Sequence, residues 1–278
     1  MFTFLKLKDK PFNVFTRVKI RQGIRYSRLG LNLLSGSIFI ASCYRLPSIS
    51  KIKSKYLSDY KIFSLWVDDL NYAMNVQVHV TGEIMTEHGL FVSNHISWLD
   101  TIVLSSIKPL SFIARHDLEH WPLLGTFTSR MQSVFINRDN KFHAYRSIPL
   151  IEKKLNEGRS VHVFPEGTTS VGKTVLPFYP MFFDAAVRTE TPVQPIVISY
   201  TDADGNLLSE PAYIDEDTFG ETLARMFLVD QIYAHVHFLP PMDSQTLGRK
   251  EMSSLSRAAI LQKLQPNTFA KDFVRINL

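Results

Sequence analysis

The stretch HGLFVSNHISWLD, residues 88–100, determines how the rest of the chain is interpreted. Residues 89–93 form a short apolar run that predicts a buried strand. Residues 97–104 predict the start of a helix, because a serine is followed three residues later by an acidic residue in the pattern of a capping box. His95 is therefore expected in the turn between a strand and a helix.

His95 and Asp100 can interact only if the chain turns between them. Within one straight helix, five positions at about 100° each would place the two side chains on different faces. If His95 precedes the helix, the carboxylate of Asp100 can accept a hydrogen bond from one ring nitrogen and leave the other nitrogen to act as a base. A plainer interpretation also fits: Asp100 and Ser97 cap the helix, and His95 is a polar loop residue.

Composition limits the kinds of protein that this chain can be. Its 278 residues, 45% of them hydrophobic, are enough for one large folded domain with or without an appendage. Cys43 is the only cysteine, so the chain can form neither an internal disulfide nor a cysteine-based zinc site. His116 and His120 have the spacing of two metal ligands on a helix, but no third ligand is evident, and we expect no metal site.

The N-terminal part of the chain is basic and then apolar. Residues 1–28 contain one acidic residue, Asp9, and eight basic ones: Lys6, Lys8, Lys10, Arg17, Lys19, Arg21, Arg25 and Arg28. Residues 29–47 are mostly apolar but contain an asparagine and three serines, which is borderline for a membrane span. Since basic residues flank this stretch, we expect it to lie in one leaflet of an anionic membrane. A buried helix, a cleaved signal or a lipid-modified cysteine are the alternatives.

Residues 54–75 show apolar positions at helical spacing and predict an amphipathic helix that leads into the main domain. We therefore divide the chain into a membrane-associating helical segment, 1–75, and a domain, 76–278. Nucleic acid is not an expected partner, because the basic residues precede an apolar segment and are not interleaved with aromatic residues.

From residue 76 onward, predicted strands and helices alternate. The strands are expected at 76–80, 90–93, 110–114, 134–136, 160–164, 193–200 and 233–239, and the helices at 97–107, 141–156, 181–189, 217–227 and 249–265. This alternation predicts an α/β fold with a mainly parallel mixed sheet flanked by helices, and residues 202–206 predict a local hairpin turn. Ligands of such sheets gather beyond the carboxyl ends of the strands.

Three further blocks follow predicted strands. VFINRDN brings Arg138 to the sheet edge, where it can bind a phosphate or carboxylate or can pair with Asp139. VHVFPEGTTS places Glu166 and Gly167 in a loop that could bind an anion or be an ordinary turn. VQPIV contains a proline, which predicts an edge, a bulge or the lip of a groove. The chain lacks the G-x-S-x-G, P-loop and G-x-G-x-x-G motifs, so serine-hydrolase and nucleotide-binding functions lose their main support.

Together NHISWLD, FINRD, FPEGTTS and VQPIV resemble, in order and separation, the four motif blocks of the glycerolipid acyltransferase family, which includes 1-acylglycerol-3-phosphate acyltransferases. The resemblance covers about residues 76–200. It implies that His95 is the general base and that Asp100 orients it. It also implies that Arg138 and Arg115 bind the acceptor's phosphate.

By the same resemblance, Glu166, Gly167 and Thr168 belong to the acceptor-binding loop. The implied reaction transfers a fatty acyl group from acyl-carrier protein or coenzyme A to a lysolipid hydroxyl, at the cytoplasmic face of the inner membrane and with no bound cofactor. Lysophosphatidate, giving phosphatidic acid, is the expected acceptor. Thr169 and Asn137 depart from the family pattern at positions that bear on the acceptor head group.

Two other functions are kept as alternatives. SNHISWLD and WPLLG also resemble the branch of the family that acylates lyso-ornithine lipid. A membrane-docking scaffold that has kept the fold without catalysis is the alternative from another class, and the intact His95 and Asp100 argue against it.

Overall fold

The structure is a computed structural model that describes residues 12–45, 55–115, 134–136 and 141–264. Seven strands form one sheet in the order β1-β7-β6-β2-β5-β3-β4. All neighbouring strands are parallel except β6 and β7, so the expected α/β fold with a mainly parallel mixed sheet is confirmed. The strands are β1 (Val76–Thr81), β2 (Leu90–Ser93), β3 (Ser111–Arg115), β4 (Val134–Ile136), β5 (Val161–Val163), β6 (Val193–Thr201) and β7 (Ile232–Phe238).

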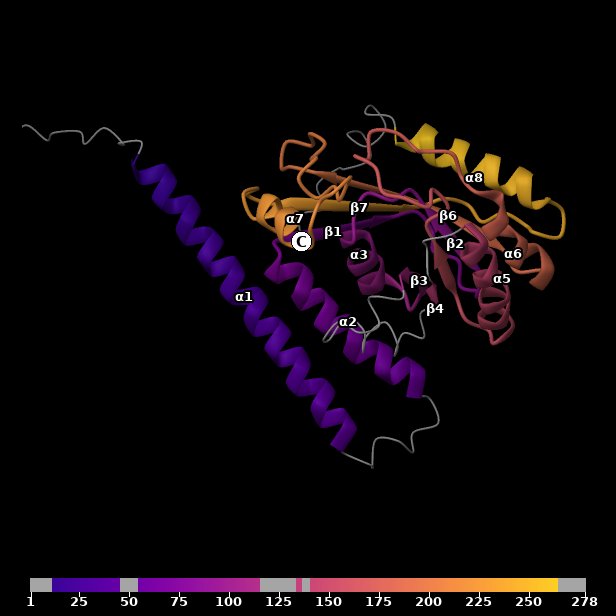
Figure 1. Cartoon of the computed structure of the whole chain (residues 1–278), viewed down its shortest axis with the longest axis horizontal. Coiled ribbons are helices and arrows are strands. Elements are labelled where there is room, and N and C mark those ends of the chain that lie inside the picture. The colour runs from indigo at the N-terminus through magenta and orange to yellow at the C-terminus, as the bar shows by residue number, and fades with distance from the viewer. Residues whose placement is uncertain (1–11, 46–54, 116–133, 137–140, 265–278) are drawn as a thin grey trace, which may run out of the picture.

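Helices cover both faces of the sheet (Figure 1). The five helices expected between and after the strands are all present: α3 (Leu99–Ile107), α5 (Lys141–Asn156), α6 (Asp184–Thr189), α7 (Phe219–Met226) and α8 (Arg249–Lys263). A short 3₁₀ helix, η3 (Pro180–Phe183), leads directly into α6. Two helices precede the sheet, α1 (Phe12–Arg45) and α2 (Lys55–Ala73).

Alternate residues of each strand point to opposite faces and divide the buried apolar side chains into two clusters. On one face, Phe91 of β2 packs in a cluster with residues of α2, α3 and α7. On the other face, Leu90 and Val92 pack in a cluster with residues of α5, α6 and α8. Since β2 is buried on both faces, its sequence is a continuous apolar run, as is typical of a parallel strand between two helical layers.

Residues 12–28 of the basic lead and residues 29–45 of the apolar stretch belong to a single helix of 34 residues, α1, which packs antiparallel to α2 (Figure 1). The indole N–H of Trp66 donates to the carbonyl of Asn32 at 3.1 Å, and the Asn32 side chain donates to Asp69 at 2.7 Å. At Gly36 an added Cβ would lie only 2.4 Å from the Trp66 ring, so the two helices meet where α1 has no side chain.

This packing bears on the apolar stretch at residues 29–47. Leu29 and Asn32 are buried, whereas Leu31 and Leu34 on the same helix are exposed, so the stretch is not a fully buried core helix. Among the residues that the structure describes, no helix has the length and apolarity to span a bilayer. Membrane association of this segment and the division at residue 75 stay predictions.

Two details of the sequence interpretation can be checked. The turn at 202–206 is confirmed: the Asp202 N–H donates to the carbonyl of Asn206, and Gly205 has φ of +83°. Of the three interpretations of Pro195, the edge strand was wrong, because β6 lies between β7 and β2. The bulge fits, because two residues of β6 between the pairs Val193–Met242 and Ile196–Phe238 face three residues of the opposite segment. Pro195 is tolerated there since it stands just outside the β6–β7 pairing, which begins at Ile196 and Phe238.

Candidate active site

The loop that carries His95 begins at Asn94, whose side chain makes the hydrogen bonds that a strand backbone would make at that position. The Asn94 amide donates to the carbonyl of Ile198 and accepts the Ile198 N–H, both at 2.9 Å. These two bonds reproduce with a side chain what a further residue of β2 would supply with its backbone. The main chain can therefore leave the sheet at His95 while the backbone N–H and carbonyl of Ile198 on β6 remain hydrogen-bonded.

His95 and Asp100 form the hydrogen-bonded pair that the turn permits. Nδ1 of His95 lies 2.8 Å from Oδ2 of Asp100. A carboxylate can only accept, so Nδ1 carries the hydrogen and Nε2 presents a lone pair. His95 keeps 9% of its surface accessible and Asp100 keeps none, so the imidazole can be reached and the carboxylate cannot.

The buried Asp100 carboxylate is satisfied by four donors. Besides Nδ1 of His95, Oδ2 accepts the backbone N–H groups of Ile96 at 2.7 Å and Ser97 at 3.0 Å. Oδ1 accepts the hydroxyl of Tyr200 at 2.6 Å. Removing a carboxylate from water is costly unless hydrogen bonds replace its hydration, and these four donors do so.

The start of α3 differs from the capping box that the sequence predicted. The helix begins after Trp98, with no side-chain hydrogen bond at its cap, and the Ser97 hydroxyl has no partner among the described residues. Asp100 does receive the Ser97 N–H, so half of the expected reciprocal pattern is present. The same carboxylate therefore both steadies the helix start and orients the imidazole, which unites the two interpretations left open by the sequence.

The His95 ring is also held on its face. It stacks on Phe164, with the ring centroids 3.7 Å apart and the planes 14° from parallel. Behind Phe164 lies His162, fully buried, with its ring centroid 4.5 Å from that of Phe164. Burial, and then the proximity of His95, lowers the pKa of His162 to about 3, so this second imidazole stays neutral.

Glu166, which the resemblance places in the acceptor-binding loop, has both carboxyl oxygens bonded to backbone N–H groups of the protein. It is buried, Oε1 accepts the His95 backbone N–H at 2.8 Å, and Oε2 accepts the Leu176 N–H at 2.9 Å. Burial is the main cause that raises the pKa of Glu166 to about 7. Glu166 therefore joins the His95 loop to the segment at Leu176, and a contact with the acceptor stays a prediction.

Other residues of the FPEGTTS loop also form hydrogen bonds that hold it, to the backbone of His95 and to Tyr213. Ser170 N–H donates to the carbonyl of His95 at 2.9 Å, and the Thr169 hydroxyl donates to the carbonyl of Tyr213. Gly167 has φ of +71° and an added Cβ would lie 2.9 Å from the Tyr179 ring, so the turn requires glycine. Gly167 and Thr168 are exposed, and of this loop they remain available to a ligand.

Of the two predicted cations, Arg115 belongs to the described residues. Arg115 is the last residue of β3, two strands from β2, and therefore belongs to the same carboxyl edge of the sheet. Arg138 and Asn137, and the histidine pair at 116 and 120, lie outside the described residues. The described residues contain no cluster of three or more His, Cys, Asp or Glu side chains suited to a metal ion.

Sequence reasoning missed Tyr200 and Asn94. Tyr200 lies at the end of a nine-residue strand that is buried throughout, so nothing in its local sequence separates it from a core aromatic residue. Burial, and then the adjacent carboxylate, raises the pKa of the Tyr200 phenol well above its ordinary value, so the hydroxyl remains a donor. Asn94 could have been suspected, because an amide directly after a buried strand needs hydrogen-bond partners.

Comparison with known proteins gives consistent results. The family model described as Acyltransferase matches residues 75–199. A lyso-ornithine lipid O-acyltransferase of Pseudomonas aeruginosa is 31% identical over 195 residues, which cover 70% of this chain and 75% of that protein. A 1-acyl-sn-glycerol-3-phosphate acyltransferase of Neisseria meningitidis is 34% identical over 126 residues, 45% of this chain and 49% of that protein.

The fold has a solved counterpart in the crystal structure of the 1-acyl-sn-glycerophosphate acyltransferase PlsC from Thermotoga maritima. The TM-score is 0.64 over 90% of this chain and all of that chain, at 18% sequence identity, so this likeness concerns the fold alone. The family model spans the loop of His95, the loop of Glu166 and most of β6. The match to the Pseudomonas relative covers 75% of that protein's length. This chain therefore belongs to the glycerolipid acyltransferase family.

Proposed function

We propose that this chain transfers a fatty acyl group from an acyl-carrier protein or coenzyme A thioester to the free hydroxyl of a lysolipid, with His95 as general base. The observation that carries the proposal is the pair formed by a reachable imidazole and a sealed carboxylate 2.8 Å away, held by donors from the loop after β2 and from β6. That arrangement fixes one tautomer and leaves Nε2 as the basic nitrogen.

The reaction follows from the position of that nitrogen. Nε2 of His95 takes the proton of the acceptor hydroxyl as its oxygen bonds to the thioester carbonyl carbon, and Asp100 stabilises the resulting imidazolium. The carbon–sulfur bond then breaks, and the leaving thiolate receives the proton from His95. No covalent acyl-enzyme is required, because the acceptor oxygen attacks the thioester directly.

Two acceptors fit this chemistry. Lysophosphatidate follows from the motif blocks, with Arg115 and Arg138 as the proposed ligands of its phosphate. Lyso-ornithine lipid is favoured by the Pseudomonas relative, because that match covers more of both chains than the Neisseria match does. Thr169 stands where the family pattern often has arginine, and its hydroxyl donates to the Tyr213 carbonyl, so this position offers no guanidinium to a phosphate.

We also propose that α1 docks on the anionic cytoplasmic surface of the inner membrane. Ile20, Ile24, Leu31, Leu34 and Ile38 fall on one side of the helix and are each between 49% and 66% exposed. This apolar stripe is about 27 Å long at 1.5 Å per residue. A strip of isolated aliphatic side chains beside arginines is typical of a helix that lies in the interface of a bilayer with anionic lipids.

The acceptor assay tests the proposed reaction. Purified protein is given a labelled acyl thioester, on carrier protein or on coenzyme A, with either lysophosphatidate or lyso-ornithine lipid, and the acylated lipid is quantified. We expect turnover of at least one acceptor. Turnover of lyso-ornithine lipid alone would identify that lipid as the acceptor. Turnover of neither lipid would contradict the proposed reaction and favour a non-catalytic scaffold.

The base assignment is tested with His95→Ala. We expect kcat/KM to fall by about 10²–10⁴-fold, since that is the usual contribution of a positioned general base. The protein should stay folded because three donors to Asp100 remain. His88→Ala removes an exposed imidazole seven residues earlier and serves as the matched control. Equal activity of the two variants would refute the assignment.

Tyr200→Phe tests whether the phenol positions the His95–Asp100 pair. Loss of a hydrogen bond to a buried carboxylate should lower kcat about tenfold with KM unchanged. The carboxylate then has one donor fewer and attracts the imidazole proton more strongly, so the acid limb of the pH–rate profile should move to higher pH. Tyr233→Phe on β7 is the control. A loss of activity with no change in pH profile would mean that Tyr200 serves packing alone.

Membrane docking is tested by placing charges on the apolar stripe. Leu34→Glu/Ile38→Glu should weaken binding to phospholipid vesicles by at least about tenfold, because each aliphatic side chain gains about 1.5 kcal/mol or more when it leaves water. Leu150→Glu/Leu255→Glu alters two exposed leucines on α5 and α8, on the other face of the sheet. Co-sedimentation in which both double variants bind like the unaltered protein would exclude this docking face.

A further inference from the structure

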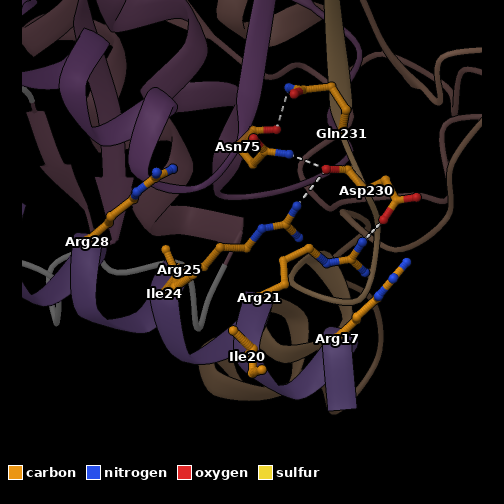
Figure 2. Close-up of a pocket in the computed structure, with 9 residues that line it drawn as sticks. All are labelled: Arg17, Ile20, Arg21, Ile24, Arg25, Arg28, Asn75, Asp230 and Gln231. Carbon is orange, nitrogen blue, oxygen red and sulfur yellow. Dashed lines mark hydrogen bonds and ion pairs between the residues drawn. The ribbon is translucent and has the colours of Figure 1, made fainter. Parts of the chain in front are cut away.

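A cavity of about 430 Å³ lies between α1 and the chain segments that enter β1 and β7 (Figure 2). Arg17, Arg21, Arg25 and Arg28 line it from α1, spaced four, four and three residues apart and hence on one side of the helix. Asp230 is the only carboxylate among the lining residues. Four guanidinium groups therefore share a small space with one opposing charge.

The two central arginines are fixed by the protein. Arg25 is buried and donates to the carbonyls of Phe227, Val229 and Asp230 at 2.9, 2.5 and 2.5 Å. Arg21 donates to the carbonyl of Leu228 at 2.7 Å and forms an ion pair with the Asp230 carboxylate. Carbonyl oxygens hold a guanidinium in place without cancelling its charge. Burial, and then Arg21 and Arg28, lowers the pKa of Arg25 to about 10, as expected for crowded positive charges.

The two outer arginines retain donors for a ligand. Arg17 makes no hydrogen bond or ion pair with any residue that the structure describes, and Arg28 lies over the Tyr72 ring at 5.2 Å. In Figure 2 these two residues stand at the ends of the row, with Arg25 and Arg21 between them. Asp230 pairs with Arg21 alone, so three of the four guanidinium charges have no opposing charge among the lining residues. Planar guanidinium groups in a row are suited to the oxygens of a phosphate.

The same cavity has an apolar side. Ile20 and Ile24 line it and are also the first two residues of the apolar stripe on α1. A ligand bound here would meet guanidinium groups at one end and aliphatic side chains at the other. This combination matches an amphiphile with a phosphate head better than it matches a free anion.

We infer that this cavity is a binding site for the phosphate of an anionic membrane phospholipid, distinct from the acceptor site at His95. The inference rests on the proposed docking of α1 and makes it more specific: one lipid is bound at a defined place, in addition to general attraction between basic residues and the bilayer. Asn75 and Gln231, which directly precede β1 and β7, also line the cavity. A bound lipid would therefore hold the N-terminal ends of these two strands at the membrane.

A matched pair of single variants separates a site from diffuse attraction. Arg17→Gln removes a cavity charge, and Lys19→Gln removes an equal charge two residues away that does not line the cavity. With vesicles of phosphatidylcholine containing phosphatidylglycerol, we expect Arg17→Gln to lose about tenfold in affinity and Lys19→Gln less than about twofold. Arg28→Gln should behave like Arg17→Gln. Arg21 and Arg25 are left intact because they hold α1 in place, and circular dichroism checks that each variant is folded.

The outcomes distinguish this inference from the docking proposal. Equal losses for Arg17→Gln and Lys19→Gln would show diffuse attraction and overturn the site, while docking would stand. Failure of the unaltered protein to bind any vesicle would overturn both. Inorganic phosphate is titrated into lipid-free protein by calorimetry as a separate arm. Phosphate binding that Arg17→Gln abolishes, with vesicle affinity unchanged, would assign the cavity to a free anion and refute the lipid.

Discussion

The interaction on which the site depends is the burial of the Asp100 carboxylate among four donors. Three of these donors come from the loop after β2 and one from the end of β6, while the carboxylate itself stands in the first turn of α3. A sealed carboxylate is stable only when its oxygens are fully engaged, so the requirement fixes the relative positions of all three segments. The imidazole is one of the four donors, and its orientation follows from the same requirement.

A second layer of contacts holds the loop from the other side. Glu166 and Ser170 bind the backbone of His95, and Phe164 covers its ring. Arg257 of α8 donates to the carbonyls of Val175 and Leu176 and so holds the segment whose N–H reaches Glu166. The motif FPEGTTS therefore acts largely as a support for the imidazole. Exposed Gly167 and Thr168 are the parts of it that can face a substrate.

Much of this could be predicted from the sequence because the signals were local. Apolar runs bounded by turn residues located all seven strands, and the spacing of His95 and Asp100 required a bend between them. Half of the capping box was wrong, because the Ser97 hydroxyl does not cap α3, although Asp100 accepts the Ser97 N–H. The edge position of Pro195 was wrong because it depends on which strands become neighbours. The role of Tyr200 could not be predicted for the same reason: the residue is a hundred positions from Asp100, and only the pairing of β2 with β6 brings them together.

The single antiparallel pairing in the sheet has a consequence for the whole molecule. Since β7 runs against β6, and β1 runs with β7, the starting ends of these two outer strands lie on the side where β2 and β5 finish. The arginine row of α1 and the imidazole of His95 thus belong to one rim of the protein. Because one strand is reversed, the helix proposed to dock on a bilayer and the proposed general base share one side of the molecule.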